Sequence, residues 1–190
     1  MKTFTLSGVS RGETGKKASK KIRKEGLIPA VLYGGESNVH FNVKQEDVRN
    51  LIFTPNIYVV DLTIDGTTKK AVLKEIQFHP VKDTVLHIDF LEVTENKPIQ
   101  MAVPVVLEGL AEGVKAGGKL TLEKRKLKVK APYTAIPDTL KIDVTNLGIG
   151  KSLQIGQLSF ENLELMEAKN AVVCSVKLTR AARGAAAKAE

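Results

Sequence analysis

Alternation of apolar and polar residues is the feature that most limits how this chain folds. Residues 57–78 read IYVVDLTIDGTTKKAVLKEIQF, two β-rich runs joined around Asp65-Gly66. An Asp-Gly pair between such runs predicts a hairpin, because a type I′ turn needs positive φ angles that these residues tolerate. The pattern therefore predicts a core built from β-strands.

Further strands are predicted on both sides of this hairpin, at residues 4–9, 30–33, 39–43 and 84–93. Residues 45–53 carry apolar side chains at helical spacing and stop before Thr54-Pro55, so they predict a short helix. Residues 1–94 are thus expected to form a compact, highly curved β-domain with one or two short helices.

The polar segment 94–98 (TENKP) is the best candidate for a domain boundary, which gives domains at 1–94 and 95–179. Strands of the second domain are predicted at 99–107, 120–129, 140–144, 163–165 and 171–178, with Gly and Pro residues spaced between them as in an all-β unit. Residues 180–190 are Ala-rich without an apolar face and are expected to form a disordered tail. The expected fold class is mainly β with a few short helices.

The chain has 190 residues and a formal net charge of +8, which favours a nucleic acid or another anionic surface as partner. Trp is absent and aromatic residues make up 5%, so contacts to phosphates of a structured RNA or DNA are expected rather than a base-stacking platform. No apolar run is long enough for a membrane span or a signal peptide. The lone Cys174 is expected to be a buried free thiol, which fits a reducing, cytoplasmic setting.

Catalytic and metal-binding patterns are absent from the sequence. Three histidines and one cysteine lack the spacing of a zinc or iron site, and no nucleophile motif occurs. Residues 148–152 (GIGKS) lack the preceding Gly-x₄ spacing of a phosphate-binding loop and predict a turn. Neither an enzymatic activity, a cofactor nor a small-molecule substrate is therefore expected.

Residues 11–24 form a dense cationic segment that contains a single acid, Glu13. Its basic residues are Arg11, Lys16, Lys17, Lys20, Lys21, Arg23 and Lys24. A polyanion rewards such a cluster through counterion release, and the apolar run 27–33 that follows would mount it on a folded core. The alternative is a helix whose basic face is simply solvated.

Two polar residues interrupt the strand predicted at 84–93. His87 and Asp89 are expected on one face of it together with Val85 and Leu91. The apolar side chains expected on the opposite face are those of Leu86, Ile88 and Phe90. The pair is either two ordinary polar residues on the surface or an RNA contact. In an RNA contact, Asp89 would accept from a 2′-OH or a base amine, or hold an arginine in position.

A second basic stretch, residues 115–130 (KAGGKLTLEKRKLKVK), lies in the second domain. On its strand part the lysines at 124, 126, 128 and 130 share one face. Such a strand could touch neighbouring rRNA or an acidic protein. It could equally be an edge strand that lysines protect from aggregation.

Several motifs, in order, resemble one known family. They are Arg11-x₃-Gly15-Lys16, ASKKIRKxG at 18–26, IPAVxYG at 28–34, HP at 79–80 and HIDF at 87–90. The second half adds VPV at 103–105, EGV at 112–114, GGxL at 117–120, IP at 136–137 and LxIG at 147–150. Over roughly residues 3 to 178 the chain resembles the bacterial 5S-rRNA-binding ribosomal protein of the large subunit, its twenty-fifth family. The long form of that family is also called general stress protein Ctc.

The resemblance implies an N-terminal β-barrel that grips 5S rRNA and a β-rich C-terminal domain. It places the family's RNA-contacting network on Arg11, Arg23, Tyr33, His87 and Asp89. Where relatives often carry Gly and Arg, this chain has lysines at 16, 17, 20 and 21, which contact phosphate as point charges. The expected RNA-binding set is therefore Arg11, Lys16, Lys17, Lys20, Lys21, Arg23, Lys24, Tyr33, His87 and Asp89.

The resemblance implies a structural protein that binds 5S rRNA in the central protuberance of the large (50S) subunit. Its expected neighbours are other rRNA and ribosomal proteins, and its expected location is the cytoplasm. A free stress protein that acts as an adaptor through its C-terminal domain is the alternative, and sedimentation with the large subunit or in light fractions distinguishes the two. A role at a membrane surface is disfavoured, because residues 16–24 offer only Ala18 and Ile22 as an apolar stripe.

Overall fold

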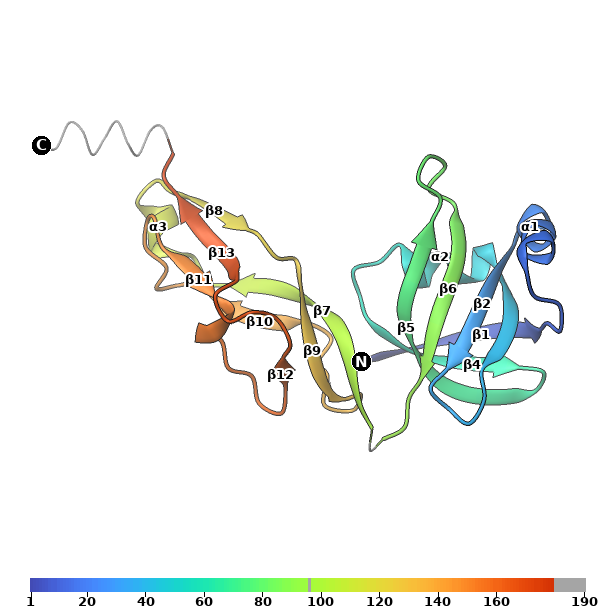
Figure 1. The fold of residues 1–190 in the computed structure, drawn as a ribbon. Helices are drawn as coiled ribbons and strands as arrows, with labels where there is room; N and C mark the ends of the chain where they lie inside the picture. The colour runs from blue at the N-terminus through green and yellow to red at the C-terminus, as the bar shows by residue number, and fades with distance from the viewer. Residues whose placement is uncertain (96, 180–190) are drawn as a thin grey trace, which may run out of the picture. The chain divides into compact units, whose positions relative to one another are not determined.

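The computed structural model describes residues 1–95 and 97–179 (Figure 1), so the expectation of a disordered tail at 180–190 lies outside the described residues. The chain divides into two compact units. The first comprises Met1–Ile99 with Pro132–Thr134, and the second comprises Gln100–Ala131 and the chain from Ala135 onward. Both are built mainly from strands, with three short α-helices among the described residues, which confirms the predicted fold class.

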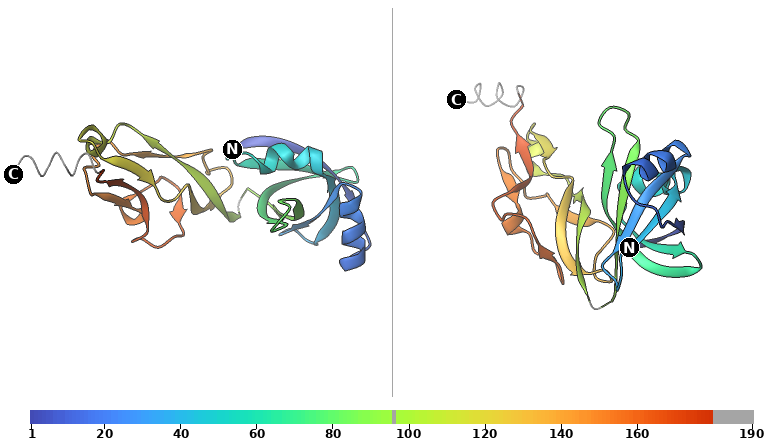
Figure 2. Two further views of the ribbon diagram at one scale, coloured as in Figure 1. Left: turned by 90° about the horizontal axis from the view of Figure 1, so that it is seen from above. Right: turned by 45° about the vertical axis from the view of Figure 1, so that its right-hand side comes forward.

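The first unit is a closed six-stranded barrel. Its strands are β1 (Lys2–Ser10), β2 (Leu27–Tyr33), β3 (Val39–Lys44), β4 (Tyr58–Ile64), β5 (Thr67–Phe78) and β6 (Val85–Glu92). They follow the order β1-β3-β2-β6-β5-β4, and the parallel pairing of β1 with β4 closes the ring. The helices α1 (Lys16–Lys24) and α2 (Gln45–Ile52) follow β1 and β3, and Figure 2 shows α1 outside the curved sheet.

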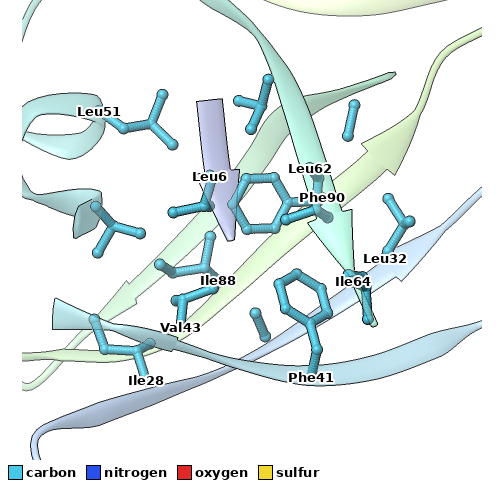
Figure 3. Packing of buried hydrophobic residues seen from close by; sticks show 14 of the residues in the cluster. Leu6, Ile28, Leu32, Phe41, Val43, Leu51, Leu62, Ile64, Ile88 and Phe90 are labelled. Carbon is cyan, nitrogen blue, oxygen red and sulfur yellow. The ribbon is translucent and has the colours of Figure 1, made fainter. Parts of the chain in front are cut away.

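Side chains that alternate along the strands fill the barrel (Figure 3). Leu6, Leu32, Phe41, Leu62 and Phe90 are at most 1% exposed, and burying each such side chain contributes about 1.5–3 kcal/mol. The rings of Phe41 and Phe90 pack with centroids 5.8 Å apart. The predicted helix at 45–53 is confirmed as α2, whose apolar face joins this core through two buried residues.

The hairpin expected at Asp65-Gly66 is present. Asp65 has φ +47° and Gly66 has φ +85°, as a type I′ turn requires, and Ile64 pairs with Thr67 across it. The two strands that this turn joins, β4 and β5, are those expected from the alternation.

Two irregularities interrupt the pairing of β5 with β6. At the second of them, Gln77 pairs with His87 and Phe78 pairs with Val85, which leaves Leu86 as an extra residue. A bulge of this kind shifts the preceding side chains to the other face. Val85 is therefore buried in the core and Leu86 is partly exposed, so the expectation that Val85 shares a face with His87 was wrong.

The second unit contains two sheets. One has the order β10 (Leu140–Asp143), β7 (Pro98–Glu108), β9 (Lys126–Pro132), β12 (Glu164–Leu165), and the other β11 (Ser152–Gln154), β13 (Val172–Lys177), β8 (Lys119–Leu122). A short helix, α3 (Glu112–Lys115), and a 3₁₀ turn at Ile155–Gln157 complete it. Cys174 is fully buried with a free thiol, as expected, and burial raises its pKa.

The single strand expected at 120–129 was wrong, because β8 and β9 belong to different sheets. Apolar side chains occupy even positions in β8 (120 and 122) but odd positions in β9 (127 and 129), so the phase changes between them. A continuous strand keeps one phase, since its side chains alternate with a period of two. Strand β11 and helix α3 were also not anticipated.

The edge-strand interpretation of the lysine-rich segment was wrong as well. Within the described part of the second unit, β9 lies between β7 and β12. Lys124 forms an ion pair with Glu167, and Lys130 lies 3.4 Å from Glu164. Two of the four lysines of this face are thus paired with acids of the segment 164–167. Among the described residues, no helix combines the length and apolarity needed to cross a membrane.

We expect Gly8→Ala to destabilise the barrel. An added Cβ on Gly8 would lie 2.5 Å from Cδ2 of Phe41, whose buried ring has no room to move. The free energy of unfolding should fall by about 1–3 kcal/mol in urea denaturation. Gly12→Ala is the matched control, because nothing lies within 4 Å of its added Cβ. Equal midpoints for the two variants would contradict this packing.

Candidate nucleic-acid interface

Strand β6 presents polar side chains on the outside of the barrel. Ile88 and Phe90 point into the core, so His87 and Asp89 face outward. Asp89 pairs in register with Val31 of β2 on one side and lies opposite Glu75 of β5 on the other. The barrel wall therefore fixes where both polar groups stand.

His87 and Asp89 form a hydrogen-bonded pair. Nδ1 of His87 lies 2.7 Å from Oδ1 of Asp89, and each side chain is 26% exposed. The contact occupies one ring nitrogen and one carboxylate oxygen. Within the described residues, Nε2 of His87 and Oδ2 of Asp89 have no other hydrogen-bond partner and can meet a ligand from outside.

Tyr33, the last residue of β2, lies within electrostatic reach of this pair. Burial raises the pKa of the Tyr33 hydroxyl, and the negative charges of Asp89 and then Glu75 raise it further. The hydroxyl is therefore neutral near pH 7 and can both donate and accept a hydrogen bond.

Arg11 stands just beyond the end of β1. Its backbone N–H donates to the carbonyl of His40 at 2.9 Å, which extends the β1–β3 ladder by one residue. Burial, followed by the nearby charge of Arg23, lowers the pKa of the Arg11 guanidinium. Its Nε and Nη1 atoms have almost no exposed surface and no hydrogen-bond partner among the described residues. The same is true of Oδ1 of Asn42. A buried N–H donor without an acceptor costs free energy, and a ligand that supplies an acceptor would remove that cost.

Arg23 ties α1 to the barrel. Its Nη1 donates to the carbonyl of Leu86 at 3.2 Å, the extra residue of the β6 bulge. Ala18 and Ile22 are half-buried on the side of α1 that faces the sheet, and Gly26, with φ +77°, ends the helix. Few residues other than glycine adopt that angle, so the turn from α1 into β2 depends on it.

The remaining basic residues of α1 are exposed and are Lys16, Lys17, Lys20, Lys21 and Lys24. None of them makes an ion pair with a described residue, and the first turn of α1 holds no acid. The helix N-terminus adds its own partial positive charge. The five lysines therefore form a cationic surface on α1, next to β2, that no nearby acid neutralises. We call this surface the basic helix.

The structure brings the sequence-predicted residues into two groups on the barrel. Arg11 and Arg23 are neighbours, and Tyr33 and His87 surround Asp89. Arg11 and Asp89 form no ion pair within the described chain, so Asp89 does not hold the Arg11 guanidinium as one expectation had it.

Sequence reasoning missed two polar residues of this surface, Glu75 and Asn42. The position of Glu75 depends on the irregularity at Lys74, which sets Glu75 opposite Asp89. No local pattern indicates such a bulge. Asn42 alternates with the core residues Phe41 and Val43 and could have been placed on the outer face from that pattern. Among the described residues, no cluster of three or more His, Cys, Asp or Glu side chains could hold a metal ion.

Comparison with known proteins gives matches over both units. The family model described as the Ribosomal L25p family matches residues 6–90, and that of the ribosomal protein TL5 C-terminal domain matches residues 98–180. Large ribosomal subunit protein bL25 of Porphyromonas gingivalis is 65% identical over 190 residues, which are 99% of each chain. The Bacteroides fragilis protein of that name is 65% identical over 173 residues, 91% of this chain and 88% of the relative. The Phocaeicola vulgatus protein is 58% identical over 196 residues, 100% of this chain and 99% of the relative.

The arrangement around Tyr33 predicts a change in its titration. Asp89→Asn should lower the pKa of Tyr33, and Glu75→Gln should lower it less, because the Asp89 charge is the larger of the two electrostatic causes. The pKa should stay above its ordinary value in both variants, since burial is unchanged. An NMR titration of ¹³Cζ-labelled tyrosine measures it, with Asp61→Asn on β4 as control. An unchanged Tyr33 titration in Asp89→Asn would contradict the geometry.

Proposed function

The chain belongs to the ribosomal L25p family, and on this premise we propose that it binds 5S rRNA in the central protuberance of the large ribosomal subunit. Membership makes it a ribosomal protein with a structural, non-enzymatic role. The single observation that carries the RNA proposal is the guanidinium of Arg11, which has two buried donors and no acceptor.

Phosphate groups are the acceptors that fit the arginines. A guanidinium offers a planar fork of donors that matches two phosphate oxygens. Burial and then the charge of Arg23 lower the pKa of Arg11, so the two guanidinium groups repel each other. A phosphate between or beside them would offset that repulsion and satisfy Nε and Nη1 of Arg11. The basic helix would contribute further phosphate contacts through its five lysines.

The second group of residues, Tyr33, His87 and Asp89, favours a ligand that carries hydroxyl groups. Oδ2 of Asp89 accepts but cannot donate, and a phosphate would repel it, so a 2′-OH or a base amine is its natural partner. The neutral hydroxyl of Tyr33 and Nε2 of His87 add a donor and an acceptor on the same surface. This combination favours RNA over DNA, because 2′-hydroxyls line the wide minor groove of A-form RNA.

We assign RNA binding to residues 1–94, since every residue of the RNA-binding set precedes residue 94. We assign residues 95–179 to contacts with neighbouring rRNA or ribosomal proteins. The place of action is the ribosome in the bacterial cytoplasm.

The sign of one substitution tests the RNA-binding mechanism. Asp89→Ala removes a negative charge, so simple attraction to a polyanion predicts tighter binding. We expect weaker binding of 5S rRNA instead, by about 2–5 kcal/mol, because partner groups at the interface lose their acceptor. Filter binding or calorimetry at fixed salt measures the change.

Asp47→Ala is the matched control for Asp89→Ala. It removes the same charge from an exposed position of α2 that does not belong to the RNA-binding set. It should leave affinity unchanged or raise it slightly. If Asp89→Ala bound 5S rRNA more tightly than the unmodified protein, attraction by a basic patch would be the whole mechanism.

The basic helix predicts a change in salt dependence. Each substitution Lys16→Ala, Lys17→Ala, Lys20→Ala, Lys21→Ala or Lys24→Ala should flatten the slope of log K against log salt by somewhat less than about 1 unit. The control is Lys141→Ala in the second unit, where Nζ already lies 2.7 Å from Glu108. Slopes identical to the control across all five variants would make α1 a solvated face.

A further inference from the structure

A groove lies beside α2, apart from the residues proposed to bind RNA. It has a volume of about 540 Å³ and lies between the end of α1, the length of α2 and the start of β6. Its lining residues are Glu25, Gly26, Leu27, Lys44, Gln45, Glu46, Val48, Arg49, Ile52, Phe53, Asp83 and Val85. No residue of the RNA-binding set is among them. We name this feature the α2 groove.

Exposed apolar side chains gather at one edge of the α2 groove. Phe53 follows α2 directly and is 65% exposed, and Phe78 at the end of β5 is 43% exposed. Their ring centroids lie 6.4 Å apart, so they form one aromatic surface. Apolar side chains clustered beside a groove mark a binding surface, because they gain free energy when a partner removes them from water.

The charges around the α2 groove differ from those of the rest of the chain. Three acids, Glu25, Glu46 and Asp83, line it against two bases, Lys44 and Arg49. None of the five forms an ion pair with another described residue. A protein of formal net charge +8 thus has an excess of acid at this groove. Unpaired carboxylates repel phosphate and attract Lys and Arg.

We propose that the α2 groove docks a cationic polypeptide segment of another protein, which inserts an apolar side chain against Phe53 and Phe78. Within the proposed function, on which this inference rests for its setting, that protein is a neighbour in the ribosomal subunit. Aromatic side chains at the centre of an interface typically carry much of its binding energy, and a rim of carboxylates would pair with the basic residues of the partner.

Two measurements separate this docking from RNA binding. The first is the affinity of the full chain for naked 5S rRNA, and the second is its affinity for large ribosomal subunits depleted of it. The double variant Phe53→Ser, Phe78→Ser should bind naked 5S rRNA like the unmodified protein. It should bind depleted subunits at least about tenfold more weakly, as expected when aromatic contact residues are truncated. Val106→Ser, which removes a side chain 42% exposed on the second unit, is the control.

Equal affinity of the double variant and Val106→Ser for depleted subunits would overturn the docking. An equal loss toward naked 5S rRNA and toward depleted subunits would overturn it too, since RNA contact or a damaged barrel would then be the cause. If the unmodified protein itself failed to bind naked 5S rRNA, the proposed function would fall, whereas the comparison of variants on subunits would still decide the docking.

The charge of the partner is tested separately. Glu46→Gln combined with Asp83→Asn should weaken binding to depleted subunits if the segment is cationic. Unchanged binding would overturn the inference. Tighter binding would also overturn it and would indicate that RNA occupies the groove. A photoreactive benzoylphenylalanine in place of Phe53 then identifies the occupant in assembled subunits. A crosslink to another protein supports the proposal, and a crosslink to rRNA or to a second copy of this chain overturns it.

Discussion

The parallel pairing of β1 with β4 is the interaction on which the rest of the first unit depends. It runs from Lys2 opposite Tyr58 to Gly8 opposite Ile64 and turns an open sheet into a ring. An open sheet of these strands would have two unpaired edges and an apolar face in water. Once the ring is closed, each strand has one set of side chains inside and the other outside. The polar surface of β6 and the position of Arg11 follow from that closure.

Departures from regular pairing give this surface its chemistry. The extra residue Leu86 places Val85 in the core and offers its carbonyl to Arg23, which fixes α1 against β6. The irregularity at Lys74 sets Glu75 opposite Asp89, next to Tyr33. Bulges of this kind redirect side chains without opening a sheet. A regular barrel of the same strands would lack both the anchor of the helix and Glu75, the second acid that raises the pKa of Tyr33.

Much of the fold could be predicted from local patterns. The Asp65-Gly66 turn and the helix at 45–53 were expected and are present, because turn chemistry and helical periodicity act over a few residues. The segment 120–129 was misassigned, although its change of phase was visible in the sequence. The ion pairs of Lys124 and Lys130 could not be predicted, since their partners Glu167 and Glu164 lie far along the chain.

The sequence by itself determined that the chain is mainly β, where the charges cluster, and that His87 and Asp89 share a face. These follow from composition and a period of two, which are local properties. Only the tertiary structure decided that Asp89 pairs with His87 rather than with Arg11. It also decided that Arg11 has two buried donors with no acceptor in residues 1–95 and 97–179. It alone assembled the α2 groove from the turn between α1 and β2, from α2 and from the start of β6. Hydrogen bonds and burial depend on distances between strands that pairing register and bulges set, and no stretch of sequence contains those distances.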